Sequence, residues 1–173
     1  MIIITPPHNL KAEPVKNWKE IRKEAKELLD FLDKKDFAGK WKDAYAISHA
    51  QVSKEPKSFF VVHRDKAWMF QNNRVIINAK ILSGENEVKN KEGCMGFPHE
   101  KVAKVRRFQN VKVEFYSPRG LFFKKLQKVT MDLEGLGAFI AQHEIDHAMG
   151  LTIHDRPYHK EKSSTQIQTN RVA

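Results

Sequence analysis

Positions 142–147 of the sequence read QHEIDH, so two histidines stand four residues apart with a glutamate directly after the first. On an α-helix this spacing puts His143 and His147 on one face, where both imidazoles can bind the same metal ion. A metal ion held in this way lowers the pKa of its water toward ~7, and the carboxylate of Glu144 can take the proton of that water. The pattern predicts a hydrolytic metal site. The alternative is a surface helix that carries these letters by chance.

A catalytic site of this class usually has three protein ligands and one open position. One zinc-protease pattern has a further histidine downstream, but this chain has Ile153 at that position and His154 one residue later. Because one residue turns a side chain by roughly 100° on a helix, we expect the third ligand elsewhere. Cys94, the only cysteine, is the candidate, since Gly93 and Gly96 allow close backbone approach. The alternative for a lone cysteine is a small buried apolar side chain, because it forms no internal disulfide.

The chain has 173 residues, 40% of them hydrophobic and 30% charged, which indicates one soluble globular domain with a real core. No apolar run approaches the ~20 residues of a membrane span, and the opening residues lack the basic leader of a signal peptide. We therefore expect a cytoplasmic protein without membrane association. The excess of 31 Lys and Arg over 21 Asp and Glu gives +10, which is typical of binding to anions such as RNA or of a well-solvated basic surface.

The elements that must position these side chains follow from periodicity. Apolar residues recur at helical spacing over 16–34, which predicts an amphipathic N-terminal helix. A second set at helical spacing predicts an apolar face on the late helix: Leu133, Leu136, Phe139 and Ile140. Aromatic and β-branched runs predict strands over 1–4, 58–63, 68–70, 74–81, 102–107, 111–116 and 121–129. A polar loop is expected over 83–91 and a hairpin turn over 117–120.

Strands between an early and a late helix indicate an α+β fold, with antiparallel sheets packed around the metal-binding helix. We expect one catalytic domain over 1–156 and a polar, loosely ordered tail over 157–173. The segment 44–52 is rich in small residues, which suits either the close approach of a ligand or tight core packing.

With these stretches identified, the chain resembles the peptide deformylases, which remove the formyl group from the N-terminal methionine of new bacterial and organellar proteins. That family carries three ordered motifs, GxGLAAxQ, EGCLS and QHExDH. This chain has AYAISHAQ at 44–51, EGCMG at 92–96 and QHEIDH at 142–147. The third motif is complete, the second keeps its first three residues, and the first keeps little beyond Gln51. The resemblance extends from about Ile2 to Arg156.

The resemblance implies hydrolysis of the N-formyl group of nascent polypeptides, with release of formate. It implies these metal ligands: Cys94, His143 and His147. The metal is typically Fe²⁺ in the cell, while Zn²⁺, Ni²⁺ or Co²⁺ suit the same ligands in a purified sample. A water on the metal would be the nucleophile, with Glu144 as general base and then acid. The side chain of Gln51 and the backbone N–H of Met95 would stabilise the oxyanion.

The implied substrate, an N-formyl-methionyl nascent peptide, would lie extended beside backbone in the manner of an added strand. The residues implied to bind it are Tyr45, Ala46, Ile47, Glu92, Gly93, Leu136, Phe139 and Ile140. Tyr45, the last three and His143 would line a pocket for the methionine side chain. The alternative for the apolar members is packing in the core. A transient ribosome contact through the basic surface and a monomeric state are also expected.

Several positions depart from the motifs: Ala44, Ala46, His49 and Gly96. We expect these changes to reshape a wall of the cleft and to leave every ligand in place. Two other functions remain open. A zinc endopeptidase would need the missing downstream ligand. A catalytically silent relative would use its basic surface to bind ribosomal RNA, although the complete ligand set argues against it.

Overall fold

The computed structural model describes residues 10–34, 44–97, 102–119 and 125–158. Its elements are η1 (Trp18–Glu20), α1 (Arg22–Asp33), β1 (Ala46–Ser48), η2 (His49–Gln51), β2 (Phe59–Val62), η3 (Arg64–Phe70), β3 (Val75–Glu92), β4 (Ala103–Arg119), β5 (Lys125–Glu134), α2 (Leu136–Ala148) and η5 (Ile153–Asp155). The strand expected over 1–4 and the tail over 159–173 fall outside the described residues.

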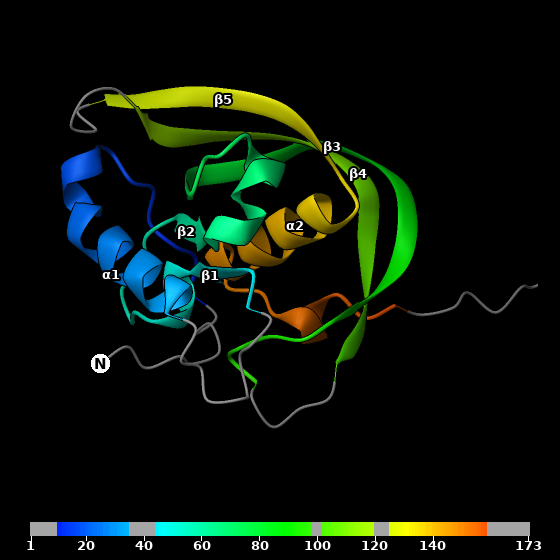
Figure 1. The fold of residues 1–173 in the computed structure, drawn as a ribbon. Coiled ribbons are helices and arrows are strands. Elements are labelled where there is room, and N and C mark those ends of the chain that lie inside the picture. The colour runs from blue at the N-terminus through cyan, green and yellow to red at the C-terminus, as the bar shows by residue number, and fades with distance from the viewer. Residues whose placement is uncertain (1–9, 35–43, 98–101, 120–124, 159–173) are drawn as a thin grey trace, which may run out of the picture.

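The strands form one antiparallel sheet in the order β1-β2-β3-β4-β5. Figure 1 shows the long strands β3, β4 and β5 curving around α2, while α1 lies against the other end of the sheet. The predicted α+β class, with antiparallel strands around a late helix and an amphipathic helix near the N-terminus, is confirmed.

Both faces of the short strand β2 are covered, which explains why all four of its residues are buried. Alternate residues of a strand point to opposite faces of the sheet. Phe60 and Val62 pack in the core beside α2, whereas Phe59 and Val61 pack in a second cluster beside α1. The continuous apolar run of β2 therefore belongs to a strand between two helices.

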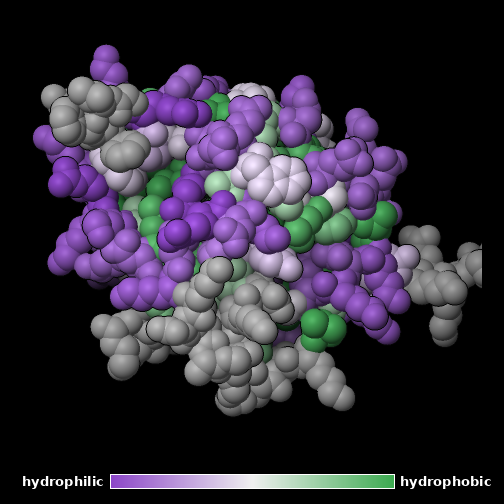
Figure 2. All heavy atoms as spheres, in the orientation of Figure 1, coloured by the Kyte–Doolittle hydropathy of each residue, from purple (hydrophilic) through white to green (hydrophobic). Residues whose placement is uncertain are grey.

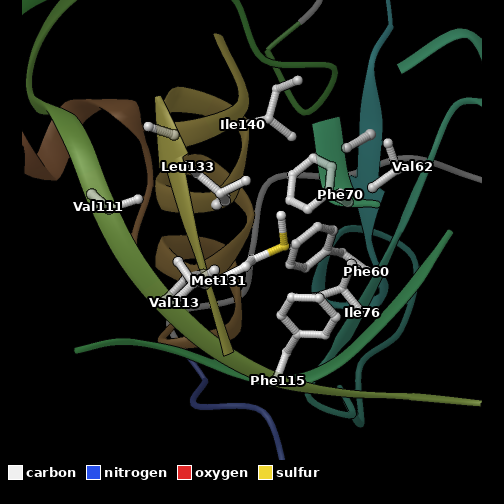
Figure 3. Close-up of a cluster of buried hydrophobic side chains, with 14 residues drawn as sticks. Phe60, Val62, Phe70, Ile76, Val111, Val113, Phe115, Met131, Leu133 and Ile140 are labelled. Atoms are coloured by element: carbon white, nitrogen blue, oxygen red, sulfur yellow. The ribbon is translucent and has the colours of Figure 1, made fainter. Parts of the chain in front are cut away.

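The main apolar core lies between α2 and the sheet (Figure 3). Its aromatic members come from three elements: Phe60 from β2, Phe70 from η3 and Phe115 from β4. The rings of Phe60 and Phe70 meet edge to face with centroids 6.2 Å apart, a favourable arrangement for aromatic pairs. Met131 and Leu133 of β5 complete this core, which fixes α2 against the sheet and so fixes the two motif histidines.

The polar segment 83–91, expected to be a loop, is in fact the second half of β3. It pairs with β4 as far as Glu92 opposite Ala103. Its Lys, Glu and Asn residues have low strand propensity, but the neighbouring strand supplies hydrogen-bond partners that no local pattern reveals. The strands predicted over 102–107 and 111–116 are likewise one continuous strand, β4.

Other predicted boundaries are also wrong. Leu133 belongs to β5, and α2 begins later, after Gly135 with its positive φ of 55°. The apolar residues 68–70 end the 3₁₀ helix η3 instead of forming a strand, because so short a run has no decisive periodicity. The turn expected over 117–120 does not begin at Ser117, which still pairs with β5. The predicted N-terminal helix is η1 followed by α1.

The first two residues of the predicted tail lie against β4. Pro157 bridges to Val105, and the N–H of Tyr158 donates to the carbonyl of Lys104 at 3.1 Å. Within the described ranges, no helix combines the length and apolarity needed to cross a membrane.

Candidate metal centre

The two histidines of α2 lie one helical turn apart, as their spacing predicts. Their Nε2 atoms are 3.0 Å apart, and their rings meet nearly perpendicular with centroids 4.5 Å apart. His147 is buried and His143 is half-buried. Ile140 and Ile145, on the same helix, pack in the main core and so set the direction in which the histidines point.

Cys94 follows the end of β3 and brings its thiol to the same point. Its Sγ lies 3.4 Å from Nε2 of His147. Taking one ligand atom from each of Cys94, His143 and His147, all lie within 4.8 Å of one another. A thiolate and two imidazoles are a donor set that binds Fe²⁺, Zn²⁺, Co²⁺ and Ni²⁺. Cys94 is therefore brought from 49 and 53 positions away in the sequence to a place where it and the two histidines suit one divalent ion.

The downstream histidine takes no part in this cluster. Ile153 stands at the position where the zinc-protease pattern has its third ligand, and it is buried beside Cys94. The ring of His154 instead meets Phe97 edge to face, with centroids 4.8 Å apart. Among the described residues, Cys94, which follows β3, is the third member of the group that could hold a metal. No residue of η5 belongs to this group.

Each imidazole has its other nitrogen engaged by an oxygen. Nδ1 of His147 is 2.9 Å from the carbonyl oxygen of Leu151, and Nδ1 of His143 is 2.9 Å from a carboxylate oxygen of Glu92. Because these oxygens accept, each Nδ1 carries a proton. A metal would then bind at Nε2, and at His143 it would have to displace the second proton of the ring. Such partners orient the ligands of metal sites and raise their basicity.

A buried charge network stands behind His143. Arg107 of β4 donates to both oxygens of Glu92, at 2.8 and 2.9 Å, and its third nitrogen pairs with Asp146. Arg156 also donates to Asp146, at 3.0 Å. The side chain of Glu92 is thus occupied by Arg107 and His143, which leaves its backbone for the substrate contact that the resemblance implies.

Sequence reasoning gave Arg107 and Asp146 no role. Asp146 could have been found from the motif, since it lies three residues after His143 and hence on the same side of the helix. Arg107 offered no signal, because only the pairing of β4 with β3 shows that it faces α2.

The network sets the charge of its members. Burial opposes ionisation of Glu92, but hydrogen bonds from His143 and Arg107 lower its pKa to about 2. Burial also opposes a charge on His143, yet its bonds to Cys94 and Glu92 raise its pKa to about 10. His147 shows the opposite effect, because burial and the neighbouring charge of His143 lower its pKa to about 3. The protein thus favours a neutral imidazole at His147, as metal binding requires.

Glu144 lies between the two histidines and is only 4% exposed. Burial raises the pKa of its carboxyl to about 7, although the charge of His143 opposes this. Its Oε2 is buried and has no hydrogen-bond partner among the described residues. A buried carboxylate oxygen without a partner costs free energy unless a water or ligand satisfies it. This orphaned atom, together with the donor set beside it, fits a site built for a metal and a water.

Gln51 brings the first motif to the same place. It ends η2, is 1% exposed, and its Nε2 donates to Sγ of Cys94 at 3.4 Å. Its Oε1 accepts from the N–H of Ser48 at 3.1 Å, which fixes the orientation of the amide. The structure therefore gathers the three motifs around one point. Met95 follows Cys94 directly, and its side chain packs in the cluster beside α1, so its suggested role needs only its backbone.

The remaining residues implied to bind substrate lie on two elements. Tyr45, Ala46 and Ile47 lead into and form β1, the edge of the sheet among the described strands. The pocket residues lie on the first turns of α2: Leu136 is 38% exposed, Phe139 half-buried and Ile140 buried. Gly93 is exposed between Glu92 and Cys94.

The motif departures cause no visible strain. Non-glycine residues with positive φ, in the described part of the chain, are Gln71, Asn72, Asn78 and Asn86. Ala44 and Ala46 therefore adopt ordinary backbone angles. His49 stacks on Phe59 with ring centroids 4.8 Å apart, and its Nδ1 accepts from the N–H of Lys57. This histidine packs between elements instead of entering the space beside Cys94.

Comparison with known proteins agrees with this geometry. The family model described as Polypeptide deformylase matches residues 3–163. The peptide deformylase of Wolinella succinogenes is 30% identical over 159 residues, which cover 89% of this chain and 86% of that one. The Aquifex aeolicus peptide deformylase is 44% identical over 82 residues, a little under half of each chain. The crystal structure of peptide deformylase from Thermotoga maritima superposes with a TM-score of 0.72 at 25% identity, over 92% of this chain and 99% of that one. The chain therefore belongs to the polypeptide deformylase family.

Proposed function

We propose that this chain is a metal-dependent hydrolase that removes the N-formyl group from the N-terminal methionine of nascent polypeptides and releases formate. One observation carries the proposal: Cys94, His143 and His147 bring three ligand atoms within 4.8 Å of one another. Glu144 and Gln51 lie beside them, so the arrangement offers an ion, a base and an oxyanion donor at one point.

Cys94, His143 and His147 would hold the ion, with Fe²⁺ as the expected metal in the cell and Zn²⁺, Ni²⁺ or Co²⁺ as substitutes. The bound ion would supply a Lewis acid that makes water nucleophilic at neutral pH. Leu151 and Glu92 keep the two imidazoles in the required tautomer through their bonds to Nδ1.

Glu144 would move the protons. Its pKa of about 7 makes the carboxylate able to accept a proton from water near neutral pH and to give it back to the departing amine. Both transfers use the same group, so the peptide leaves with a free amino terminus. A carboxyl with a pKa near the working pH is well suited to these two roles.

Gln51 and Met95 would stabilise the negative charge that develops on the formyl oxygen. The amide of Gln51 is held by Ser48 and directed at Cys94, next to which the backbone N–H of Met95 lies. Such fixed donors each contribute about 2.7–4 kcal/mol to transition-state stabilisation in comparable sites.

The substrate peptide would lie extended along the edge strand β1, with its methionine side chain toward Tyr45 and the first turns of α2. The residues proposed to bind it are Tyr45, Ala46, Ile47, Glu92, Gly93, Leu136, Phe139 and Ile140. A cytoplasmic monomer that meets nascent chains at the ribosome completes the proposal.

Replacement of the base tests the proposal. Glu144→Ala should keep one metal per chain by elemental analysis, while formate release from a formyl-Met peptide falls at least ~100-fold, as loss of general acid–base catalysis predicts. Glu134→Ala is the matched control, because Glu134 is an exposed glutamate on β5. Unchanged turnover in Glu144→Ala would contradict the proposal.

A further inference from the structure

Four cationic side chains gather on the outer face of the β3–β4 hairpin: Lys89, Lys91, Lys104 and Arg106, here called the basic patch. Lys89 lies directly opposite Arg106 in the sheet register, and Lys91 lies directly opposite Lys104. All four are exposed, while the residues between them on each strand are buried or half-buried. The alternation shows that the four share one face.

This pairing costs stability. Like charges directly opposite each other across an antiparallel pair are destabilising, and here two such pairs follow in succession. Among the described residues, the patch makes one ion pair, between Arg106 and Glu87 at 3.3 Å, and both of its side chains are largely exposed. The patch therefore keeps an excess of positive charge, which an anionic partner would neutralise.

Aromatic rings flank the patch. Lys89 lies over the ring of Tyr158 at 5.8 Å from its centroid, and Tyr158 is held beside β4 by its hydrogen bond to Lys104. On the other side, Phe108 follows Arg106 by two residues on the same strand and is 37% exposed. Cations alternating with aromatic rings are the combination that binds phosphates and stacks bases.

We infer that the basic patch binds single-stranded nucleic acid, with phosphates against the four cations and bases against Phe108 and Tyr158. Residues two apart on a strand are roughly 6.6 Å apart, a spacing comparable with that of successive phosphates along an extended strand. In the same orientation as Figure 1, Figure 2 shows mainly hydrophilic side chains over this hairpin at the right of the molecule. The inference does not rest on the proposed hydrolysis.

Other occupants fit less well. A membrane surface needs a continuous apolar face to insert. Of the residues that the structure describes near the patch, the large apolar ones that are exposed are Val102 and Phe108, at its two ends. The Phe108 ring also covers Gly84, where a Cβ would lie 2.4 Å from it. The chain's own segment 159–173 cannot neutralise the patch, because it carries three basic side chains and one acidic one.

The test measures binding of labelled poly(U) and poly(dT) to the metal-loaded full chain as salt is varied. Because a single strand loses about 0.7 in the slope of log K against log salt for each neutralised phosphate, four contacts predict a slope of about −3. The double variant Lys91→Gln/Lys104→Gln should bind the polymers at least ~10-fold more weakly. Because it lacks two of the four phosphate contacts, the magnitude of its slope should be smaller by about 1.4. Binding of either polymer with this dependence supports the inference.

Lys23→Gln/Lys54→Gln is the matched control, since it removes the same charge from exposed lysines outside the β3–β4 hairpin. Tyr158→Ala should weaken binding by about 5- to 100-fold through lost stacking. Equal weakening by the two double variants, or patch-dependent binding to phosphatidylserine vesicles and to neither polymer, would overturn the inference. Formate release from a short formyl peptide is expected to stay unchanged in Lys91→Gln/Lys104→Gln, so this result and that of the proposed function are read separately.

Discussion

The two faces of one hairpin treat charge in opposite ways. On the inner face, Glu92 of β3 and Arg107 of β4 are buried, and each charge has an opposite charge at hydrogen-bond distance. On the outer face of the same hairpin, Lys91 and Lys104 face each other with like charge. Burial removes the water that would otherwise solvate an ion, so the inner face tolerates only paired charges. Water and salt screen the outer face, which can therefore carry an excess.

This difference separates two tasks. The inner charges hold His143 through Glu92 and so orient one imidazole of the candidate metal centre. The outer charges orient nothing inside the molecule and remain available to a partner. A substitution on the inner face should therefore affect folding and metal binding strongly. Its neighbour on the outer face should change the free energy of unfolding by less than about 1 kcal/mol and leave metal binding unchanged.

Arg107→Ala is the most severe way to test the inner face. It leaves Glu92 and Asp146 buried without their partner, which should lower the free energy of unfolding by about 3–5 kcal/mol. It should also weaken metal binding by roughly 10- to 100-fold, because the support of His143 is lost. Urea unfolding and metal titration measure the two effects.

Arg106→Ala is the matched control, because the same residue type is removed from the adjacent position of the same strand. The exposed ion pair between Arg106 and Glu87 should contribute less than about 1 kcal/mol to the free energy of unfolding. Equal destabilisation by the two variants would show that the two faces do not differ as described.

Acid should weaken the inner face through Glu92. Its pKa is about 2 in the folded protein against an ordinary value of 4.5, so its stabilisation is complete above pH ~4.5 and is lost as the pH falls toward 2. At about 1.4 kcal/mol per pKa unit, the loss should reach ~3 kcal/mol. Urea unfolding of the metal-free protein across this range measures it. Glu92→Gln should make the free energy of unfolding depend less on pH in this range, whereas Glu87→Gln should not. An unchanged pH dependence in Glu92→Gln would assign the acid sensitivity to other groups.

The smallest effect is expected on the outer face, and it has the opposite sign. Lys104→Glu places opposite charges across the strands at Lys91, so the free energy of unfolding should rise by about 0.2–1 kcal/mol. The free energy of unfolding of Lys104→Gln should lie between those of the unsubstituted protein and Lys104→Glu. High salt should reduce the differences among the three. A loss of stability in Lys104→Glu would mean that the like charges are already compensated.

The convergence of Cys94, His143 and His147 could be predicted from the sequence because its signals are local. Helical spacing places His143 beside His147, and the glycines around Cys94 mark an unusual turn. Arg107 could not be predicted, since its role depends on strand register and on burial against a helix far along the chain. The segment 83–91 was misassigned for the same reason, because a charged strand is stabilised by its neighbour more than by its own propensity.

The most direct test of the central claim is the absorption spectrum of the cobalt-substituted protein. Cys94 is the only cysteine of the chain, so a thiolate-to-cobalt charge-transfer band can come from no other side chain. We predict one cobalt per chain with this band, kept in Glu144→Ala and absent in Cys94→Ser. Cobalt bound without the band, or an unchanged spectrum in Cys94→Ser, would show that the thiol does not join the two imidazoles at one ion.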